Sequence, residues 1–346
     1  MDLLAQFGAS FLSQLQSPTL AFLIGGMVLA ALGSKLTVPD AIYQFIIFVL
    51  LMRIGLHGGM EIKEADLAAL ALPALMASLT GIVCVLLGWL TLARLPGVSF
   101  DDAIATSGLF GAVSASTLAA ALVVMEQEAL SYEAWAPALY PFMDIPALVL
   151  AIVLASMAAQ KAKAKAAADG GTVAEGRKSV GVGRIIKDSL RGSALSALLL
   201  GIAIGLFAEP GRVYEEFYNP LFRGFLSILL LVMGMEAYSR LAELRGVAHW
   251  FAVYALIAPI VHGLVGFGLG YIAHVTVGFS GGGVVILAII ASSNSDISGP
   301  PTLRAGIPTA NPASFIGSST SIGTPIAIAV CIPLFIALGD AVFGFG

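Results

Sequence analysis

Charged residues are scarce in this chain. They make up 11% of its 346 residues, and 58% of the residues are hydrophobic, whereas a soluble globular protein carries about 25% charged residues. A chain with so little charge cannot cover a water-facing surface, and we expect no nucleic-acid partner. The composition is that of a protein whose partner is the lipid bilayer and which crosses it several times.

Cysteine is nearly absent too. Cys84 and Cys331 both fall in apolar segments without CxxC pairing, so we interpret them as small buried residues rather than a disulfide or a metal pair. The chain has no GxxxxGK(S/T) motif, so ATP does not drive it directly. His262 has no matching ligand cluster, and we interpret it as a packing residue or a local hydrogen bond. No nucleophile is grouped with a base, and we therefore expect no enzyme.

Long apolar segments take up most of the chain. A transmembrane helix needs about 20 apolar residues, and we predict ten spans, at 18–34, 40–58, 67–93, 103–125, 137–159, 190–208, 217–238, 248–273, 281–303 and 312–338. Residues 1–16 show helical spacing of apolar residues without the features of a signal peptide, which predicts a short interfacial helix. The predicted fold class is an all-α polytopic membrane protein.

One long polar interruption, at 160–189, indicates the orientation. It contains seven lysines and arginines, and basic residues gather on the cytoplasmic side of a membrane. Placing this loop in the cytoplasm puts most of the 17 lysines and arginines on that side and both termini outside the cytoplasm. We therefore predict a multi-pass protein of the plasma (inner) membrane with a cytoplasmic central linker.

The two halves of the chain resemble each other. Gly55 in LMRIGL matches Gly234 in LLVMGM, and Pro146 in DIPA matches Pro325 in GTPI, both with an offset of 179 residues. Five spans in each half is an odd number, so the second repeat would be inverted, as in many secondary carriers. Chance similarity of apolar segments is the alternative. The predicted organisation is a first five-helix repeat at 1–159, a linker at 160–189 and a second repeat at 190–346.

The ninth predicted span stops being apolar in its middle. From Ser292 to Thr302 it carries serines, an asparagine, an aspartate, a glycine and two prolines. Lipid cannot hydrogen-bond freed backbone groups, so irregular backbone at this depth survives only inside protein or beside a water-filled cavity. Such breaks mark the binding sites of many transporters. The run from Gly108 to Thr117 occupies the corresponding place in span four and predicts a second break; small-residue helix packing is the alternative.

Two breaks would bring two helix N-termini together near the membrane centre. In span nine Ser298 can act as N-cap, with Pro300 or Pro301 in the first turn, and Ser114 or Ser116 can cap in span four. Free N–H groups and the positive ends of the helix dipoles favour a small anion there. The exposed carbonyls of the preceding half-helices suit a sodium ion. The candidate anion-binding residues are Gly111, Ala112, Ser114, Ser116, Thr117, Ser298, Gly299 and Thr302.

Few carboxylates lie deep inside the apolar segments. Asp296 is in the span-nine break, and Asp144 is in span five between two prolines. A carboxylate inside a membrane is costly and indicates function by default; a structural acid bonded to broken backbone is the alternative for Asp144. Thr324 lies in the segment of span ten that corresponds to the Asp144 region. The candidate sodium ligands are Asp144, Ser292, Ser293, Asn294, Ser295, Asp296 and Thr324.

These segments together resemble the cyanobacterial sodium-dependent bicarbonate transporter family along nearly the whole chain, with 160–189 as the weakest region. The resemblance rests on QSPTLAFLIGG at 16–26, GLFGAVS at 108–114, YPFMDIPA at 140–147 and ASSNSDISGPPTLRAG at 291–306. It implies a ten-span, inverted-repeat carrier that assembles as a homotrimer. It also implies a mobile core of spans 3–5 and 8–10, a scaffold of spans 1, 2, 6 and 7, and a cytoplasmic, trimeric PII-like regulatory protein.

The function that the resemblance implies is sodium-dependent import of bicarbonate by alternating access, as in a carbon-concentrating mechanism, with Na⁺ as the coupling ion. The predicted site suits this substrate, because a small planar monoanion can accept several N–H and hydroxyl bonds. Three alternatives remain open. One is a Na⁺ symporter for another small anion, and a second is a Na⁺/H⁺ exchanger that uses Asp144 or Asp296. The third is a receptor, for which no segment is long enough to form a soluble signalling domain.

Overall fold

The computed structural model describes residues 17–64, 67–168, 182–242, 244, 247 and 249–345, and these residues form helices and connecting segments without a β-strand. The interfacial helix predicted at 1–16 and the middle of the predicted linker lie outside the described residues. In chain order the helices are α2 (Pro18–Ala31), α3 (Asp40–Glu64), α4 (Leu67–Leu92), α5 (Phe100–Gly111), α6 (Ala115–Gln127), α7 (Tyr140–Ala168), α8 (Val182–Leu190), α9 (Ser193–Phe207), α10 (Gly211–Val213), α11 (Asn219–Arg240), α12 (Trp250–Val277), α13 (Gly281–Ser292), α14 (Gly299–Gly306), α15 (Thr324–Ile326) and α16 (Ile332–Phe343).

Apolar helical segments dominate the described part of the chain. Seven of them are long and apolar enough to cross a membrane: 40–63, 69–92, 100–127, 136–161, 211–240, 250–277 and 313–343. Three shorter apolar helices, α2, α9 and α13, fall within the other three predicted spans. Between residues 313 and 331 the last of these segments contains π-helical turns, whose wider backbone is frequent at functional sites.

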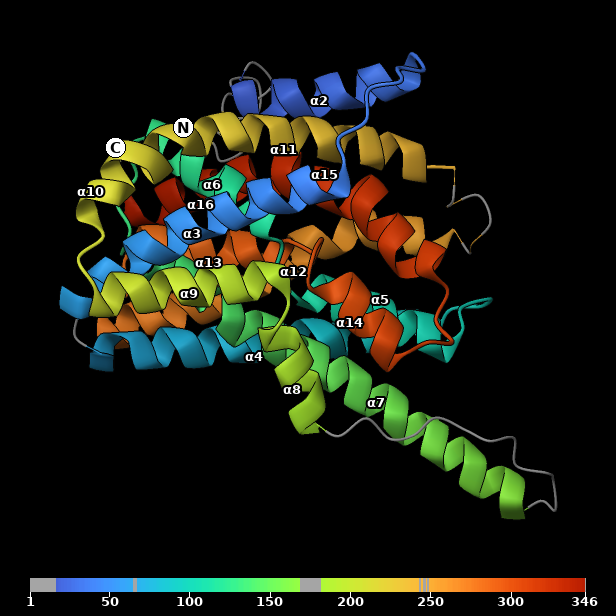
Figure 1. Cartoon of the computed structure of the whole chain (residues 1–346). Helices are drawn as coiled ribbons and strands as arrows, with labels where there is room; N and C mark the ends of the chain where they lie inside the picture. Colours follow the sequence, from blue (N-terminus) through green and yellow to red (C-terminus); the bar gives the residue numbers. More distant parts are fainter. Residues whose placement is uncertain are drawn as a thin grey trace.

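Two helix pairs pack with their backbones almost in contact. α2 lies along α11 and α3 along α9 (Figure 1). A Cβ atom on Gly26 of α2 would overlap the carbonyl of Leu231 in α11, and one on Gly55 of α3 would lie 2.9 Å from the Cα of Gly201 in α9. Small residues therefore set the separation of these helices, which is a common way to pack helices in a membrane.

Two neighbouring glycines of α2 test this packing. We expect Gly26→Ala to destabilise the protein by about 1–3 kcal/mol, because the new methyl group forces α2 away from α11. Gly25→Ala is the matched control, since nothing lies within 4 Å of a Cβ atom there, and it should leave stability unchanged or raise it by up to about 1 kcal/mol. Thermal unfolding of the two variants in detergent measures the difference; equal unfolding midpoints would contradict the packing.

Helix α7 is longer than the predicted span five. It runs to Ala168, and Figure 1 shows it leaving the bundle, with α8 beside it. Alanine and lysine dominate its last turns, and both residues are strong helix formers, so the helix continues after the apolar residues stop. The range predicted as a linker, 160–189, thus contains helix at both of its ends.

A buried arginine connects three helices. Arg53 of α3 is 6% exposed, and its Nη2 lies 2.8 Å from Oε1 of Glu126 in α6 and 3.0 Å from Oδ1 of Asn219 in α11. Its guanidinium also lies over the ring of Phe222, 4.3 Å from the centroid. Arg223 approaches the same glutamate at 3.7 Å. Glu126 therefore connects the end of α6 to α3 and α11.

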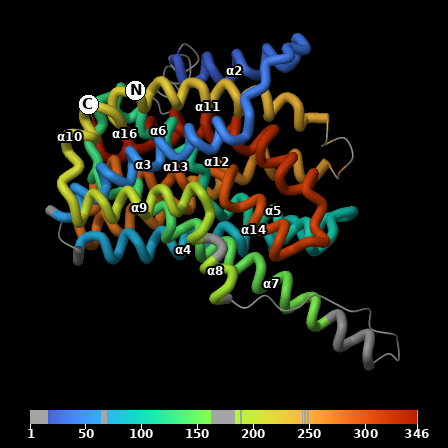
Figure 2. The backbone as a smooth tube through the Cα atoms, in the orientation of Figure 1, coloured from blue at the N-terminus to red at the C-terminus, as the bar shows by residue number. Residues whose placement is uncertain are grey.

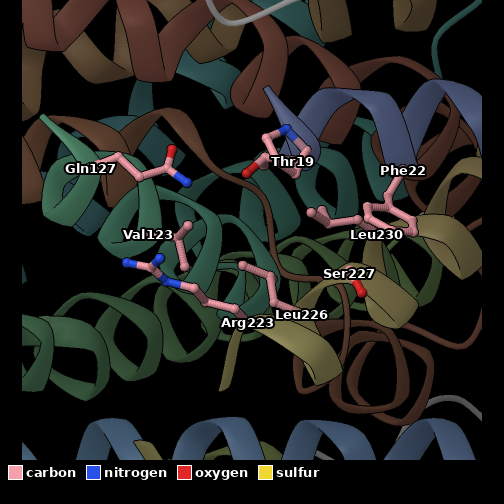
Figure 3. A pocket seen from close by; sticks show the side chains of 9 residues that line it. Thr19, Phe22, Val123, Gln127, Arg223, Leu226, Ser227 and Leu230 are labelled. Carbon is pink, nitrogen blue, oxygen red and sulfur yellow. The ribbon is translucent and has the colours of Figure 1, made fainter. Parts of the chain in front are cut away.

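Arg223 also lines a cavity of about 190 Å³ between α2, α6 and α11 (Figure 3). Its side chain is 62% exposed, whereas that of Arg53 is 7% exposed. Solvent weakens the interaction of an exposed ion pair. We therefore expect the ion pair of Glu126 with the buried Arg53 to contribute more to stability than its pair with the exposed Arg223.

Removing the charge of Glu126 should leave Arg53 buried without its carboxylate. We expect Glu126→Gln to destabilise the protein by roughly 2–3 kcal/mol, below the 3–5 kcal/mol of a fully buried pair, because the Glu126 side chain is 28% exposed. Arg223→Gln, the control, should change stability by less than about 1 kcal/mol. Chemical unfolding measures the stability of both variants. A larger loss of stability for Arg223→Gln than for Glu126→Gln would contradict the conclusion that Arg53 forms the main ion pair.

Candidate functional site

Two pairs of consecutive helices inside the bundle are each separated by a short non-helical segment, which we call an interruption. α5 ends at Gly111 and α6 begins at Ala115, while α13 ends at Ser292 and α14 begins at Gly299. The residue after each first helix is extended, with ψ of 163° at residue 112 and 178° at residue 293. α5 and α14, far apart in the sequence, lie side by side (Figure 2). Both interruptions fall within the segments that the sequence predicts to be irregular.

Backbone groups freed at the first interruption bond to the second one. The carbonyl of Leu109 accepts the backbone N–H of Ser295 at 2.9 Å. The N–H of Ser114 donates to Oγ of Ser293, also at 2.9 Å. In a continuous helix both groups would have bonded within their own helix. Because buried backbone groups need partners, the two interruptions complete each other.

Asp144 of α7 contacts both interruptions. It is fully buried, and its Oδ1 accepts the backbone N–H of Val113 at 3.0 Å. Its Oδ2 accepts the hydroxyl of Ser298 at 3.2 Å. The bond to Val113 is the contact expected if Asp144 is a structural acid that pairs with freed backbone groups. The bond to Ser298 places the same carboxylate beside the start of α14.

Asp296 lies between α13 and α14, and its carboxylate faces the N-terminus of α6. Oδ2 accepts the hydroxyl of Ser114 at 3.0 Å and also the hydroxyl of Ser116. Negative charge is stabilised at a helix N-terminus, so Asp296 takes the position that suits an anion. Its second oxygen, Oδ1, is buried without a hydrogen-bond partner in the described structure.

The two interruptions differ in how the second helix is capped. Ser114 caps α6 as predicted, because its Oγ accepts the N–H of Thr117 at 3.0 Å. The predicted cap on α14 is wrong: Ser298 makes no capping bond, since its hydroxyl donates to Asp144. Oγ of Ser295 instead accepts the N–H of Gly299 at 2.8 Å. Prolines occupy the first turn of α14, as predicted.

Asn294 connects the second interruption to the last helical segment. Its Oδ1 accepts the hydroxyls of Ser319, at 2.5 Å, and Thr324, at 2.7 Å. Its amide nitrogen is buried without a partner among the described residues, as is the hydroxyl of Thr117. These unpaired donors suit an anion, and the unpaired oxygen of Asp296 suits a cation. The residues present therefore fit both a small anion and sodium.

The remaining predicted residues make local contacts or form the end of a helix. The hydroxyls of Ser292 and Thr302 bond to carbonyls of their own segments, those of Ile289 and Ser298. The structure does not bring these two hydroxyls to the opposite interruption. Gly111 and Ala112 form the end of α5 and its extended continuation. Within the described residues no group of three or more His, Cys, Asp or Glu could hold a metal, so a sodium site here needs neutral oxygens beside a carboxylate.

Sequence reasoning missed Tyr140. Its hydroxyl is fully buried and lies 3.5 Å from Oγ of Ser298, the residue that bonds to Asp144. Tyr140 and Asp144 are four residues apart on α7, and residues at this spacing share a helix face. That spacing was the available signal, and it places a second polar group of α7 beside the start of α14.

Comparison with known proteins identifies the family of the chain. Individually curated proteins give no match. A family model described as the Na⁺-dependent bicarbonate transporter superfamily matches residues 18–340, from the start of α2 into α16, and it confirms the resemblance seen in the sequence. The family comprises transporters, not enzymes. The chain therefore belongs to the Na⁺-dependent bicarbonate transporter superfamily.

Proposed function

We propose that the protein imports bicarbonate together with sodium by alternating access and binds both ions between the two interruptions. The observation that supports this most directly is the bonding of Ser114 and Leu109 to residues 293–295 beside two carboxylates, Asp144 and Asp296. Three buried polar atoms without hydrogen-bond partners belong to residues in or beside the interruptions, namely Thr117, Asn294 and Asp296. Family membership supplies the substrate and the sodium dependence.

Two inverted five-helix repeats, each with a broken span, form the architecture of this proposal. Helices α5 and α13 both have 12 residues, and each follows a serine whose side chain accepts the N–H of the third helical residue. The hydrogen-bonded serines Ser114 and Ser293 are 179 residues apart, the offset found between the sequence halves. Equivalent residues of an inverted repeat meet close to the axis that relates the repeats, and this supports ten spans with breaks in the fourth and ninth.

Unpaired atoms suggest how the ions divide the site. We assign the free Oδ1 of Asp296 to sodium, together with hydroxyl and carbonyl oxygens near Asp144. The free hydroxyl of Thr117 and the free amide nitrogen of Asn294 are assigned to bicarbonate. The oxygen of Asn294 already accepts the hydroxyls of Ser319 and Thr324. We therefore propose that Asn294 binds bicarbonate rather than sodium, the ion assigned to it from the sequence.

Coupling follows from the position of Asp296. Its carboxylate accepts the two hydroxyls at the start of α6, Ser114 and Ser116, which are the donors that bicarbonate needs. Two negative charges about 4 Å apart repel each other by about 4 kcal/mol at an effective dielectric of 20. Sodium on Asp296 offsets this repulsion and turns the carboxylate toward itself, which leaves the hydroxyls to the anion. Sodium therefore binds first.

The remaining parts of the proposal rest on the resemblance and on charge. We place the central linker in the cytoplasm and both termini outside it. The carrier is proposed to form a homotrimer, in which spans 3–5 and 8–10 move against spans 1, 2, 6 and 7. A trimeric PII-like protein binds on the cytoplasmic side. A single cysteine introduced at residue 175 should resist an impermeant external reagent in intact cells; labelling there would reverse the topology.

Uptake of labelled bicarbonate into proteoliposomes tests the function. We expect an inward sodium gradient to accelerate uptake at least tenfold over an equal potassium gradient. Competition by unlabelled formate and acetate in the same assay tests selectivity for bicarbonate. Sodium flux that is coupled to protons and independent of bicarbonate would identify a Na⁺/H⁺ exchanger and overturn the proposal. Sodium-driven uptake of a different anion, with none of bicarbonate, would replace the substrate.

A further inference from the structure

A buried histidine contacts the end of α5 from outside both interruptions. His262 of α12 is 2% exposed, and its Nδ1 lies 3.0 Å from the carbonyl oxygen of Phe110. Its Nε2 lies 3.4 Å from the hydroxyl of Tyr254. A carbonyl only accepts hydrogen bonds, so Nδ1 carries the proton and donates it, and Nε2 is left to accept from the tyrosine.

The carbonyl of Phe110 has lost its helical partner. In a continuous helix it would accept the N–H of Ser114, four residues later, but that N–H donates to Ser293. The preceding carbonyl, that of Leu109, has the N–H of Ser295 instead. Phe110 therefore depends on a side chain, because a buried carbonyl without a partner is costly. His262 supplies that hydrogen bond.

Ring packing holds the imidazole in this orientation. Tyr254 packs edge-on against Phe110, with 5.2 Å between ring centroids, and edge-on against His262 at 6.1 Å. The three rings connect α12 to the last turn of α5. This turn leads directly into residues 112–114, where Val113 bonds to Asp144 and Ser114 caps α6.

We infer that His262 is a positioning residue for ion binding: its Nδ1–H fixes the Phe110 carbonyl, and with it the end of α5 beside which both ions bind. The inference rests on the proposed function for what binds there. Without this hydrogen bond the last turn of α5 is less well fixed, and part of the free energy of ion binding is used to order that turn. Ordering at the moment of binding weakens affinity, while the transport step between bound states keeps its rate.

Three substitutions separate the hydrogen bond from the packing. In His262→Asn the amide nitrogen can take the place of Nδ1, whereas in His262→Gln the longer side chain carries the amide to the place of Nε2. His262→Leu keeps an apolar side chain of similar size without a donor. We expect the Leu and Gln variants to raise the half-saturating sodium concentration about tenfold, as for the loss of one hydrogen bond, with the maximal uptake rate unchanged. The Asn variant should stay within about threefold of the wild type.

Two readouts are compared on detergent-purified and reconstituted protein: the sodium concentration that half-saturates uptake, and the sodium concentration that half-maximally raises the thermal unfolding midpoint. The thermal-unfolding readout needs no bicarbonate. It therefore tests the role of His262 even if the wild type shows no sodium-driven bicarbonate uptake. Tyr254→Phe is the control; it removes the contact to Nε2 and should leave both values within about threefold. Wild-type sodium dependence in His262→Leu, or equal impairment of Asn, Gln and Leu, would overturn the inference.

Discussion

The Asp296→Asn variant is expected to take up bicarbonate at nearly the same rate with and without sodium. In the wild type the negative carboxylate stands at the hydroxyls of Ser114 and Ser116 and repels an anion until sodium offsets it. A repulsion of about 4 kcal/mol corresponds to a factor of several hundred in anion affinity. Asparagine keeps an oxygen that can accept both hydroxyls but has no charge. The variant should therefore bind bicarbonate alone and equilibrate it without accumulation.

Uptake into proteoliposomes at matched sodium and potassium concentrations measures this uncoupling. We expect the ratio of the two rates to fall from at least tenfold to about one, while the sodium needed to raise the unfolding midpoint increases. Asp102→Asn is the control, because Asp102 is a half-buried carboxylate at the opposite end of α5 that accepts the N–H of Asn311. A variant at Asp296 that still requires sodium, or that binds no bicarbonate at all, would refute this account of coupling.

Asp144→Asn is expected to stop transport while the protein stays folded. The oxygen of an asparagine can accept the N–H of Val113, and its amide nitrogen can donate to Oγ of Ser298, so both contacts are kept, the second with its direction reversed. What is lost is one negative charge beside the sodium position. With an interaction of about 4 kcal/mol between unit charges 4 Å apart at an effective dielectric of 20, sodium-driven uptake should fall by at least two orders of magnitude.

Asp144→Leu separates the charge from the hydrogen bonds. It leaves the N–H of Val113 buried without its partner, at a cost of about 1–3 kcal/mol, and it removes the carboxylate that accepts the hydroxyl of Ser298. We therefore expect the Leu variant to unfold several degrees below the Asn variant, with transport absent in both. Thermal unfolding and uptake are measured on the same preparations. Wild-type uptake in Asp144→Asn would make Asp144 the purely structural acid that the sequence also allows.

Local chemistry made both interruptions predictable. Serine, glycine and proline next to one another favour caps and turns over continued helix, and their place inside apolar runs could be seen without a structure. The start of α14 at two prolines and the capping role of Ser114 are of this kind, because each depends on residues within one helical turn.

Long-range pairing was not predictable. Ser298 donates to Asp144 across 154 residues, and His262 approaches Phe110 across 152. The sequence shows that Ser298 has a hydroxyl near a helix start, and capping is the local use of such a group. A carboxylate accepts a stronger hydrogen bond than a neutral group, so the distant partner replaces the local cap. Which carboxylate arrives there depends on helix packing, and the sequence pattern does not contain that information.

The bond between Ser114 and Ser293 has a consequence for biosynthesis. The two residues are 179 positions apart, and a ribosome adds about 5–20 residues per second, so the first interruption is made roughly 10–40 s before its partner. During that interval the N–H of Ser114 lacks its acceptor, Ser293, and the carbonyl of Leu109 lacks its donor, the N–H of Ser295. The nascent first half must therefore keep this segment away from lipid, in contact with water or with the insertion machinery, until the second half arrives.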